Sequence, residues 1–181
     1  MSQAGVEIKQ VTQDMAAHVQ MIGNLIVSIK AQRVLELGTD VGDSTRIISA
    51  ALKQTGGKLW TIDVKPLDWN WKELGNVEAL TGNSLDFIPD RLIDLLFIDD
   101  DHTYPHVLNE LRKFVPCVRP GGYILLHDVL NKEHGPGVQR SIEEFCSPLK
   151  WGWSIFPNSH GMAVIQTPTT IVGPAQVGKA G

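Results

Sequence analysis

The stretch from Val34 to Thr45 constrains the fold of this chain more than any other segment. Its first four residues, Val34–Leu37, form an apolar-rich run of the length of a buried strand, and Gly38 opens a short loop after them. The triplet Asp43–Thr45 consists of residues that cap helices, so it predicts a helix start. A strand, a glycine loop and a helix start in this order are typical of nucleotide-type sites. In such sites the glycines allow close backbone approach and free N–H groups bind an anion.

The spacing of the two loop glycines narrows the type of ligand. Gly38 and Gly42 are separated by three residues, whereas a dinucleotide-binding loop has the spacing G-x-G-x-x-G. A pyrophosphate is therefore disfavoured, and a ligand that ends in a carboxylate fits better. Glu36, just before the first glycine, is an acid that could bind a positively charged part of the same ligand.

A second acid supports a nucleoside-type ligand. Lys58–Val64 is predicted to be the next parallel strand, with Asp63 near its carboxyl end. An acid at this position typically binds ribose hydroxyls. Either segment alone could be purely structural, but together they favour an adenosine-containing ligand.

The composition excludes several classes of protein. With 181 residues the chain is most simply one domain, and its net charge of −4 leaves no basic field for nucleic acid. No apolar run approaches the roughly 20 residues of a membrane helix, and the N-terminus lacks a secretory pattern. Cys117 and Cys146 lack metal-site spacing and are expected to be free thiols of a cytoplasmic protein.

Strands and helices alternate along the chain, which predicts a doubly wound, mostly parallel α/β sheet. The expected strands are 34–37, 58–64, 77–82, 93–98, 123–126, 151–156 and 162–166, the last two forming a hairpin. The expected helices are 14–30, one from residue 43, 105–115 and 138–146. Arg119–Gly122 is expected to be a tight turn. The domain is expected to span 14–166, between a flexible N-terminus at 1–13 and a disordered tail at 167–181. The apolar stripe of the first helix is expected to pack on the core, cover the ligand site or form a homodimer seam.

Polar residues gather at the carboxyl ends of these strands, where ligands bind in doubly wound sheets. Asn83 and Ser84 are placed to reach an adenine ring. Asp99–Asp101 are three consecutive acids that repel one another unless a cation or solvent screens them. Their hard oxygen donors suit Mg²⁺ or Ca²⁺.

Residues 15–166 resemble a class I S-adenosylmethionine-dependent methyltransferase. The most specific match is Phe97–Tyr104 with Pro120–Gly122 and His127–Asp128. It is similar to the small-molecule O-methyltransferases often assigned to family 24 and to cephalosporin hydroxylase-like proteins. The resemblance implies a Rossmann-like seven-stranded sheet of order 3-2-1-4-5-7-6 with a C-terminal antiparallel hairpin. The cofactor loop corresponds to Glu36–Thr39 and Gly42–Thr45, although Asp40 stands where many relatives have a glycine.

The resemblance also implies roles for individual residues. The residues expected to bind S-adenosylmethionine are Glu36, Gly38, Thr39, Gly42, Ser44, Asp63, Asn83, Ser84 and Asp99. Ser44 is the expected partner of the methionine carboxylate. Asp99, His127 and Asp128 are the expected ligands of Mg²⁺, although a histidine is a poorer Mg²⁺ ligand than an acid. Asp101 is the expected catalytic base, and His102 or His127 could take that role because an imidazole titrates near neutral pH.

Simpler structural roles stay open for several residues. Asp101–Thr103 could only cap the helix that follows. Trp69 and Trp71 could line a ligand pocket or cover the edge of the core. The other histidines are expected to face solvent or to have no role: His18, His106, His134 and His160.

The predicted function is transfer of the methyl group of S-adenosylmethionine to an oxygen atom of a small molecule, assisted by a divalent metal. Loops 65–76 and 129–136 are expected to select the acceptor. Two alternatives remain, a catalytically silent adenosine- or metal-binding module of the same fold and a nucleotide-dependent oxidoreductase. The missing G-x-G-x-x-G counts against the oxidoreductase.

Overall fold

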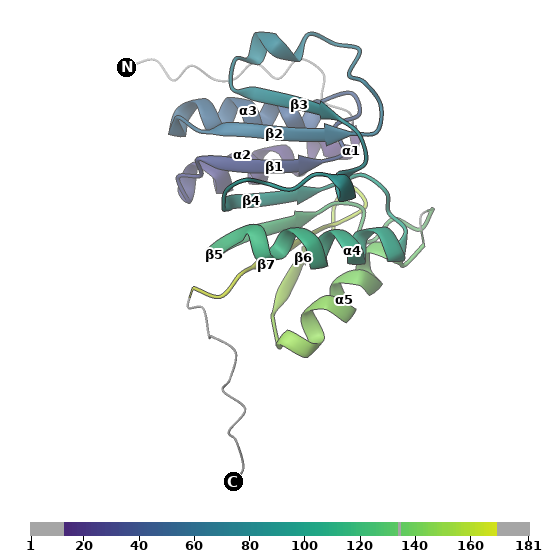
Figure 1. Cartoon of the computed structure of the whole chain (residues 1–181). Coiled ribbons are helices and arrows are strands. Elements are labelled where there is room, and N and C mark those ends of the chain that lie inside the picture. The colour runs from purple at the N-terminus through teal and green to yellow at the C-terminus, as the bar shows by residue number, and fades with distance from the viewer. Residues whose placement is uncertain (1–12, 134, 170–181) are drawn as a thin grey trace.

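A computed structural model describes residues 13–133 and 135–169 of the chain. They form one seven-stranded sheet of order β3-β2-β1-β4-β5-β7-β6 (Figure 1). The strands are β1 (Arg33–Leu37), β2 (Lys58–Asp63), β3 (Val77–Thr81), β4 (Ile93–Ile98), β5 (Val118–Leu126), β6 (Trp153–Phe156) and β7 (Met162–Gln166). Strands β1 to β5 pair in parallel, whereas β7 is antiparallel to both β5 and β6. The predicted strand order and C-terminal hairpin are confirmed.

Helices cover both faces of the sheet (Figure 1). The α-helices are α1 (Gln13–Ala16), α2 (Val19–Ser28), α3 (Asp43–Thr55), α4 (Tyr104–Phe114) and α5 (Gly137–Leu149). The 3₁₀ helices are η1 (Trp71–Leu74), η2 (Ser84–Asp86) and η3 (Val115–Cys117). Helices α2 and α3 pack together on one face, and α4 and α5 pack together on the other.

The central strand β4 contributes side chains to the hydrophobic core on each face of the sheet. Its side chains alternate between the faces of the sheet, so Leu95 and Phe97 join the cluster under α2 and α3. Leu96 and Ile98 join the cluster under α4 and α5. All four are 3% exposed or less, and burying a side chain of this size stabilises the fold by about 1.5–3 kcal/mol. Because helices cover both faces, the strand is almost continuously apolar.

The predicted first helix, 14–30, is divided into α1 and α2. The break lies at Ala17–His18 and turns the imidazole of His18 inward, where its Nε2 lies 2.7 Å from the carbonyl oxygen of Asn158. His18 is 1% exposed. This histidine therefore joins the N-terminal helices to the loop between β6 and β7.

The predicted turn Arg119–Gly122 is an irregular section inside β5. Ile93 pairs with Val118, and the next pair is Leu95 with Tyr123, so β5 carries extra residues at this point. The guanidinium of Arg119 lies 2.6 Å from Asp94, and the Thr167 N–H donates to the carbonyl of Gly122. These contacts hold residues 119–122 against β4 and the segment after β7, so the chain does not form a tight turn here.

Residues 167–169, the first of the expected disordered tail, pack against the end of the sheet instead. Thr167 is buried and its hydroxyl donates to the carbonyl of Arg119 at 2.8 Å, and the Pro168 carbonyl accepts the Gly121 N–H. Residues 1–12 and 170–181 lie outside the described part of the chain, so the flexible N-terminus and the rest of the tail stay predictions.

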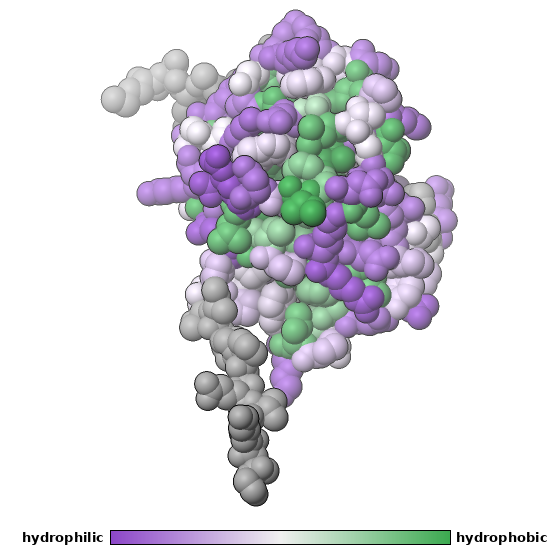
Figure 2. All heavy atoms as spheres, in the orientation of Figure 1, coloured by the Kyte–Doolittle hydropathy of each residue, from purple (hydrophilic) through white to green (hydrophobic). Residues whose placement is uncertain are grey.

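The surface is mixed rather than uniformly polar. Figure 2 shows apolar side chains along the middle of one face, interrupted by hydrophilic ones. Among the described residues no helix has both the length and the apolar character needed to cross a membrane.

Candidate active site

A cavity of about 520 Å³ opens at the carboxyl ends of β1 to β4. Its walls come from the loop after β1, the segment after β2, the segment after β3, the acids after β4, and the first turn of α4. The lining residues are Gly38, Asp40, Val41, Ile62–Asp68, Gly82–Ser84, Asp99–Asp101 and His106. The volume lies within the range typical of small-molecule sites, and parallel sheets place such sites at this edge.

The glycine loop runs directly against the end of β4. Gly38 has φ +87°, and a Cβ atom there would lie 2.1 Å from the carbonyl oxygen of Asp99. Gly42 has φ +81°, and a Cβ there would meet the ring of Trp69 at 2.3 Å. Only glycine fits either position without a shift of its neighbours. The sequence therefore needs both glycines for the shape of the loop.

Asp63 holds this loop in place from the end of β2. Its Oδ2 accepts the N–H groups of Thr39 and Asp40, each at 2.9 Å, and its Oδ1 accepts the N–H of Lys65 at 2.9 Å. Burial would raise the pKa of this carboxyl, but the three backbone hydrogen bonds outweigh it and lower the pKa. Asp63 is thus an ionised acid in the cavity wall.

Glu36 lies beneath the loop, outside the cavity lining. It is 0% exposed, and its Oε2 accepts the hydroxyl of Thr45 at 2.6 Å. Burial raises its pKa to about 7. The predicted cap at Asp43–Thr45 is wrong, because Gly42 is the N-cap residue of α3 and no side chain caps it. The Thr45 hydroxyl binds Glu36 instead.

The residues predicted to bind the cofactor fall into two layers. Gly38, Asp63, Asn83, Ser84 and Asp99 line the cavity. Glu36, Thr39, Gly42 and Ser44 lie behind it, and Thr39 shares a 2.6 Å hydrogen bond between its hydroxyl and that of Thr61.

The two tryptophans after β2 have different roles. Trp71 packs against the core cluster under α2 and α3. Trp69 covers Gly42, and the guanidinium carbon of Arg46 lies 4.2 Å from the centre of its ring. Both tryptophans lie outside the cavity lining, so Trp71 takes the core role and Trp69 supports the glycine loop from outside.

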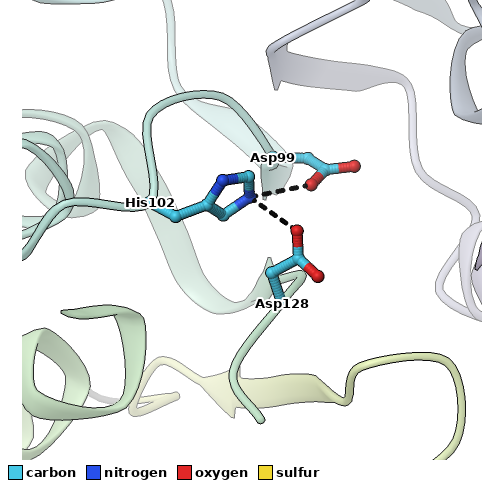
Figure 3. Close-up of side chains that lie close together, drawn as sticks. All are labelled: Asp99, His102 and Asp128. Atoms are coloured by element: carbon cyan, nitrogen blue, oxygen red, sulfur yellow. Dashed lines mark hydrogen bonds and ion pairs between the residues drawn. The ribbon is translucent and has the colours of Figure 1, made fainter. Parts of the chain in front are cut away.

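Asp99, His102 and Asp128 meet beside the carboxyl ends of β4 and β5 (Figure 3). The Nε2 of His102 lies 3.0 Å from Asp128 Oδ2 and 3.4 Å from Asp99 Oδ1. Asp128 has φ +59°, a conformation that aspartate tolerates better than most residues. This group of three residues is called the first cluster below.

Charge compensation dominates the electrostatics of the first cluster. Burial would raise the pKa of Asp99, but the hydrogen bonds from His102 and His127 keep it below the usual range. Burial would likewise raise the pKa of Asp128, but its hydrogen bonds to His102 and His127 hold it far below that range. Burial disfavours the imidazolium of His102, yet its hydrogen bonds to Asp128 and Asp99 raise its pKa to about 9. At neutral pH the cluster therefore holds two carboxylates and a protonated imidazole.

His127 lies under the first cluster. It is 1% exposed, and its Nδ1 is 3.4 Å from Asp99 Oδ1 and 3.7 Å from Asp128 Oδ1. Its ring meets the ring of His18 edge-on at 5.4 Å. The three atoms that converge most closely belong to Asp99, Asp128 and His102, with His127 behind them.

Asp101 lies in the cavity wall and also holds the turn before α4. It is exposed in the cavity wall, and its Oδ1 accepts the N–H of Thr103, the N-cap residue of α4, at 2.8 Å. Burial alone would raise its pKa, but the hydrogen bonds from the backbone and side chain of Thr103, together with the nearby charges of His106 and His102, outweigh burial and lower the pKa. The carboxylate is ionised and open to a ligand.

Two of the histidines expected to face solvent have partners in the structure. His160, in the loop between β6 and β7, is half-exposed, and its Nδ1 lies 3.3 Å from Asp128 Oδ1. His106 is largely buried and contacts Asp100, Glu110 and Ser84. The sequence already indicated the contact between His106 and Glu110, because these residues are four positions apart and share a helix face. His134 lies outside the described residues.

Known proteins resemble this chain in sequence over about half of its length. A family model described as a methyltransferase domain matches residues 35–129. The uncharacterized protein R132 of Acanthamoeba polyphaga mimivirus is 30% identical over 93 residues, which are 46% of this chain and 42% of that protein. The chain spans less than half the length of the curated relatives it matches.

Solved structures share the whole fold at low sequence identity. The O-methyltransferase TomG from Streptomyces achromogenes, involved in tomaymycin synthesis and solved with SAM, superposes with a TM-score of 0.65 at 20% identity. That match covers 88% of this chain and 82% of TomG. An O-methyltransferase from Bacillus cereus, solved with SAH, has a TM-score of 0.68 at 21% identity, with coverage of 87% and 82%.

Proposed function

Because the chain belongs to the methyltransferase domain family, we propose that it binds S-adenosylmethionine in this cavity and transfers the methyl group to an oxygen atom of a small molecule. One observation carries the proposal. A single cavity joins the glycine loop, Asp63 and Asn83–Ser84 to the acids Asp99–Asp101. The nucleoside part of the cofactor and the methyl group that it donates would therefore both lie along one edge of the sheet.

The nucleoside end rests on Asp63. Each oxygen of its carboxylate already accepts backbone N–H groups, and a carboxylate has about four acceptor positions in all. One position remains, on Oδ1, and a ribose hydroxyl would use it. The same carboxylate would then fix both the loop and the ligand, so binding and loop order are coupled.

The reacting end rests on Asp101. A methyl sulfonium needs little activation, so the protein must align the acceptor and help it lose a proton. Asp101 is ionised, open to the cavity and held by the Thr103 N–H, and we assign it as the base. His102 is protonated at neutral pH through Asp99 and Asp128. Its role in the proposal is to orient these acids.

A divalent cation fits the first cluster in its charge and donor set. Asp99 and Asp128 supply two anionic oxygens, and His102 would supply a ring nitrogen once a metal ion has displaced its proton. A nitrogen donor suits Zn²⁺ better than Mg²⁺, so with His102 rather than His127 as the third ligand this donor set would take a different ion from the one expected. When bound, such an ion would lower the pKa of an acceptor hydroxyl.

Calorimetric titration tests the proposal. The protein is titrated with S-adenosylmethionine, its demethylated product and NAD, each with and without Mg²⁺ or Mn²⁺. Binding of the first two but not NAD supports the proposal, and binding of NAD alone favours the oxidoreductase. A panel of phenols, catechols and sugars, assayed by release of the demethylated product, then separates an enzyme from a silent binding module.

A further inference from the structure

A second group of acids and an imidazole lies behind the wall of the same cavity. Asp100 follows Asp99 at a bend in the chain, and its side chain lies against α4. There it meets His106 and Glu110. Ser84, from η2, completes the group. These four residues are called the second cluster.

The contacts of the second cluster all meet at one atom. The Nε2 of His106 lies 3.2 Å from Asp100 Oδ2, 3.4 Å from Glu110 Oε1 and 3.3 Å from Ser84 Oγ. A ring nitrogen carries at most one hydrogen, so it can donate properly to only one of the three oxygens. Charge-assisted hydrogen bonds are also shorter, at about 2.7–2.9 Å. Hydrogen bonding alone therefore accounts poorly for this arrangement.

Buried oxygen atoms point to a missing partner. Glu110 is 0% exposed, and among the described residues its Oε2 has no hydrogen-bond partner. Oδ1 of Asp100 is buried and also lacks one within the described chain. A buried carboxylate without hydrogen bonds is strongly unfavourable unless another charge compensates it.

We propose that the second cluster is a site for a transition-metal cation of the Zn²⁺ type, bound by Asp100, His106 and Glu110 with Ser84 alongside. In a tetrahedral shell with ligand bonds of about 2.0–2.1 Å, neighbouring ligand atoms lie about 3.3–3.4 Å apart. The three distances from His106 Nε2 match this spacing. Two carboxylates neutralise a dication, and a nitrogen donor selects Zn²⁺ or Mn²⁺ over Ca²⁺.

The second cluster differs from the first in its place and its residues. The two are formed by alternate side chains after β4, so Asp99 serves one and Asp100 the other. Asp100, His106 and Ser84 also line the cavity, whereas Glu110 lies behind them. An ion here would stiffen the wall formed by η2 and α4. The inference depends on these side chains alone and is independent of the proposed methyl transfer.

Metal titration of tag-free, chelator-treated protein tests the inference. Zn²⁺ binding is followed by calorimetry, and Co²⁺ is used as a probe whose visible absorption reports a tetrahedral nitrogen–oxygen shell. Every variant is made in an Asp99→Asn, Asp128→Asn background, which removes the carboxylates of the first cluster. We expect this background to keep one Zn²⁺ per chain and to melt at a higher temperature with Zn²⁺.

His106→Gln and the nearly isosteric Glu110→Gln should each weaken Zn²⁺ binding by more than about 100-fold, because each removes a direct ligand. His160→Gln is the matched control, since it removes a histidine that contacts Asp128 and not the second cluster. Two results would overturn the site. One is absence of Zn²⁺ and Co²⁺ binding in the background protein, and the other is unchanged binding in both His106→Gln and Glu110→Gln.

Discussion

Replacing Gly38 by alanine should damage both the fold and the ligand site, because the residue has two separate reasons to be glycine. Its φ of +87° is unfavourable for alanine by about 1–2 kcal/mol. In addition, a Cβ would lie 2.1 Å from the carbonyl oxygen of Asp99, which belongs to the backbone and cannot rotate away. The end of β4 would have to move, and overpacking of this kind costs about 1–3 kcal/mol.

Gly75 provides a matched control for the first of these effects. Its φ is +76°, but nothing lies within 4 Å of the position where a Cβ would be added. Gly75→Ala should therefore lower the free energy of unfolding by about 1–2 kcal/mol, and Gly38→Ala by about 2–5 kcal/mol. For a domain of this size each 1 kcal/mol corresponds to a melting temperature lower by about 2–4 °C.

The assay is thermal unfolding of the wild type and both variants, followed by titration with S-adenosylmethionine at a temperature where all are folded. Gly38→Ala should bind at least about tenfold more weakly, equivalent to about 1.4 kcal/mol, while Gly75→Ala should bind like the wild type. Equal losses of stability in the two variants, with equal affinities, would refute the argument that the loop must approach β4 closely.

Other substitutions test the roles of individual acids. Burial raises the pKa of Glu36 from 4.5 to about 7, so the folded state holds a proton that the unfolded state has lost, and stability should fall as pH rises between these values. Glu36→Gln should remove that fall. Relative to the wild type, the variant should therefore gain up to about 3 kcal/mol of unfolding free energy between pH 4 and pH 8, as measured by denaturation at several pH values. Parallel stability profiles of the two proteins would contradict this. Asp63→Ala should weaken S-adenosylmethionine binding at least about tenfold and lower the melting temperature, because it releases the N–H groups of Thr39 and Asp40; unchanged affinity by calorimetry would exclude the ribose role. Asp101→Asn should abolish methyl transfer but keep cofactor affinity, and its amide oxygen can still accept the Thr103 N–H; a loss of stability with full activity would instead favour a purely capping role.

The sequence alone was sufficient for the architecture. Short apolar runs that alternate with amphipathic helices specify a parallel sheet covered on both faces. In β4 the strand period places Leu95 and Leu96 on opposite faces, and both are buried because both faces are covered. The position of the site followed as well, since parallel strands bring their carboxyl ends to one edge. Asp63 and Asp99 could be placed in the cavity wall on that basis.

Tertiary structure decided which side chains meet at that edge. Glu36 ends up under the loop because α3 places Thr45 against it, and this depends on how the helix packs rather than on where the strand ends. Both His102 and His127 contact the two acids, and His102 comes closest, at 3.0 Å from Asp128, which adopts φ +59°. The second cluster joins residues from three elements, and no local pattern reports their distances. Strand and helix periods are local properties of a sequence, whereas loop conformations depend on the whole packed fold, so the strands could be predicted but the convergence of side chains could not.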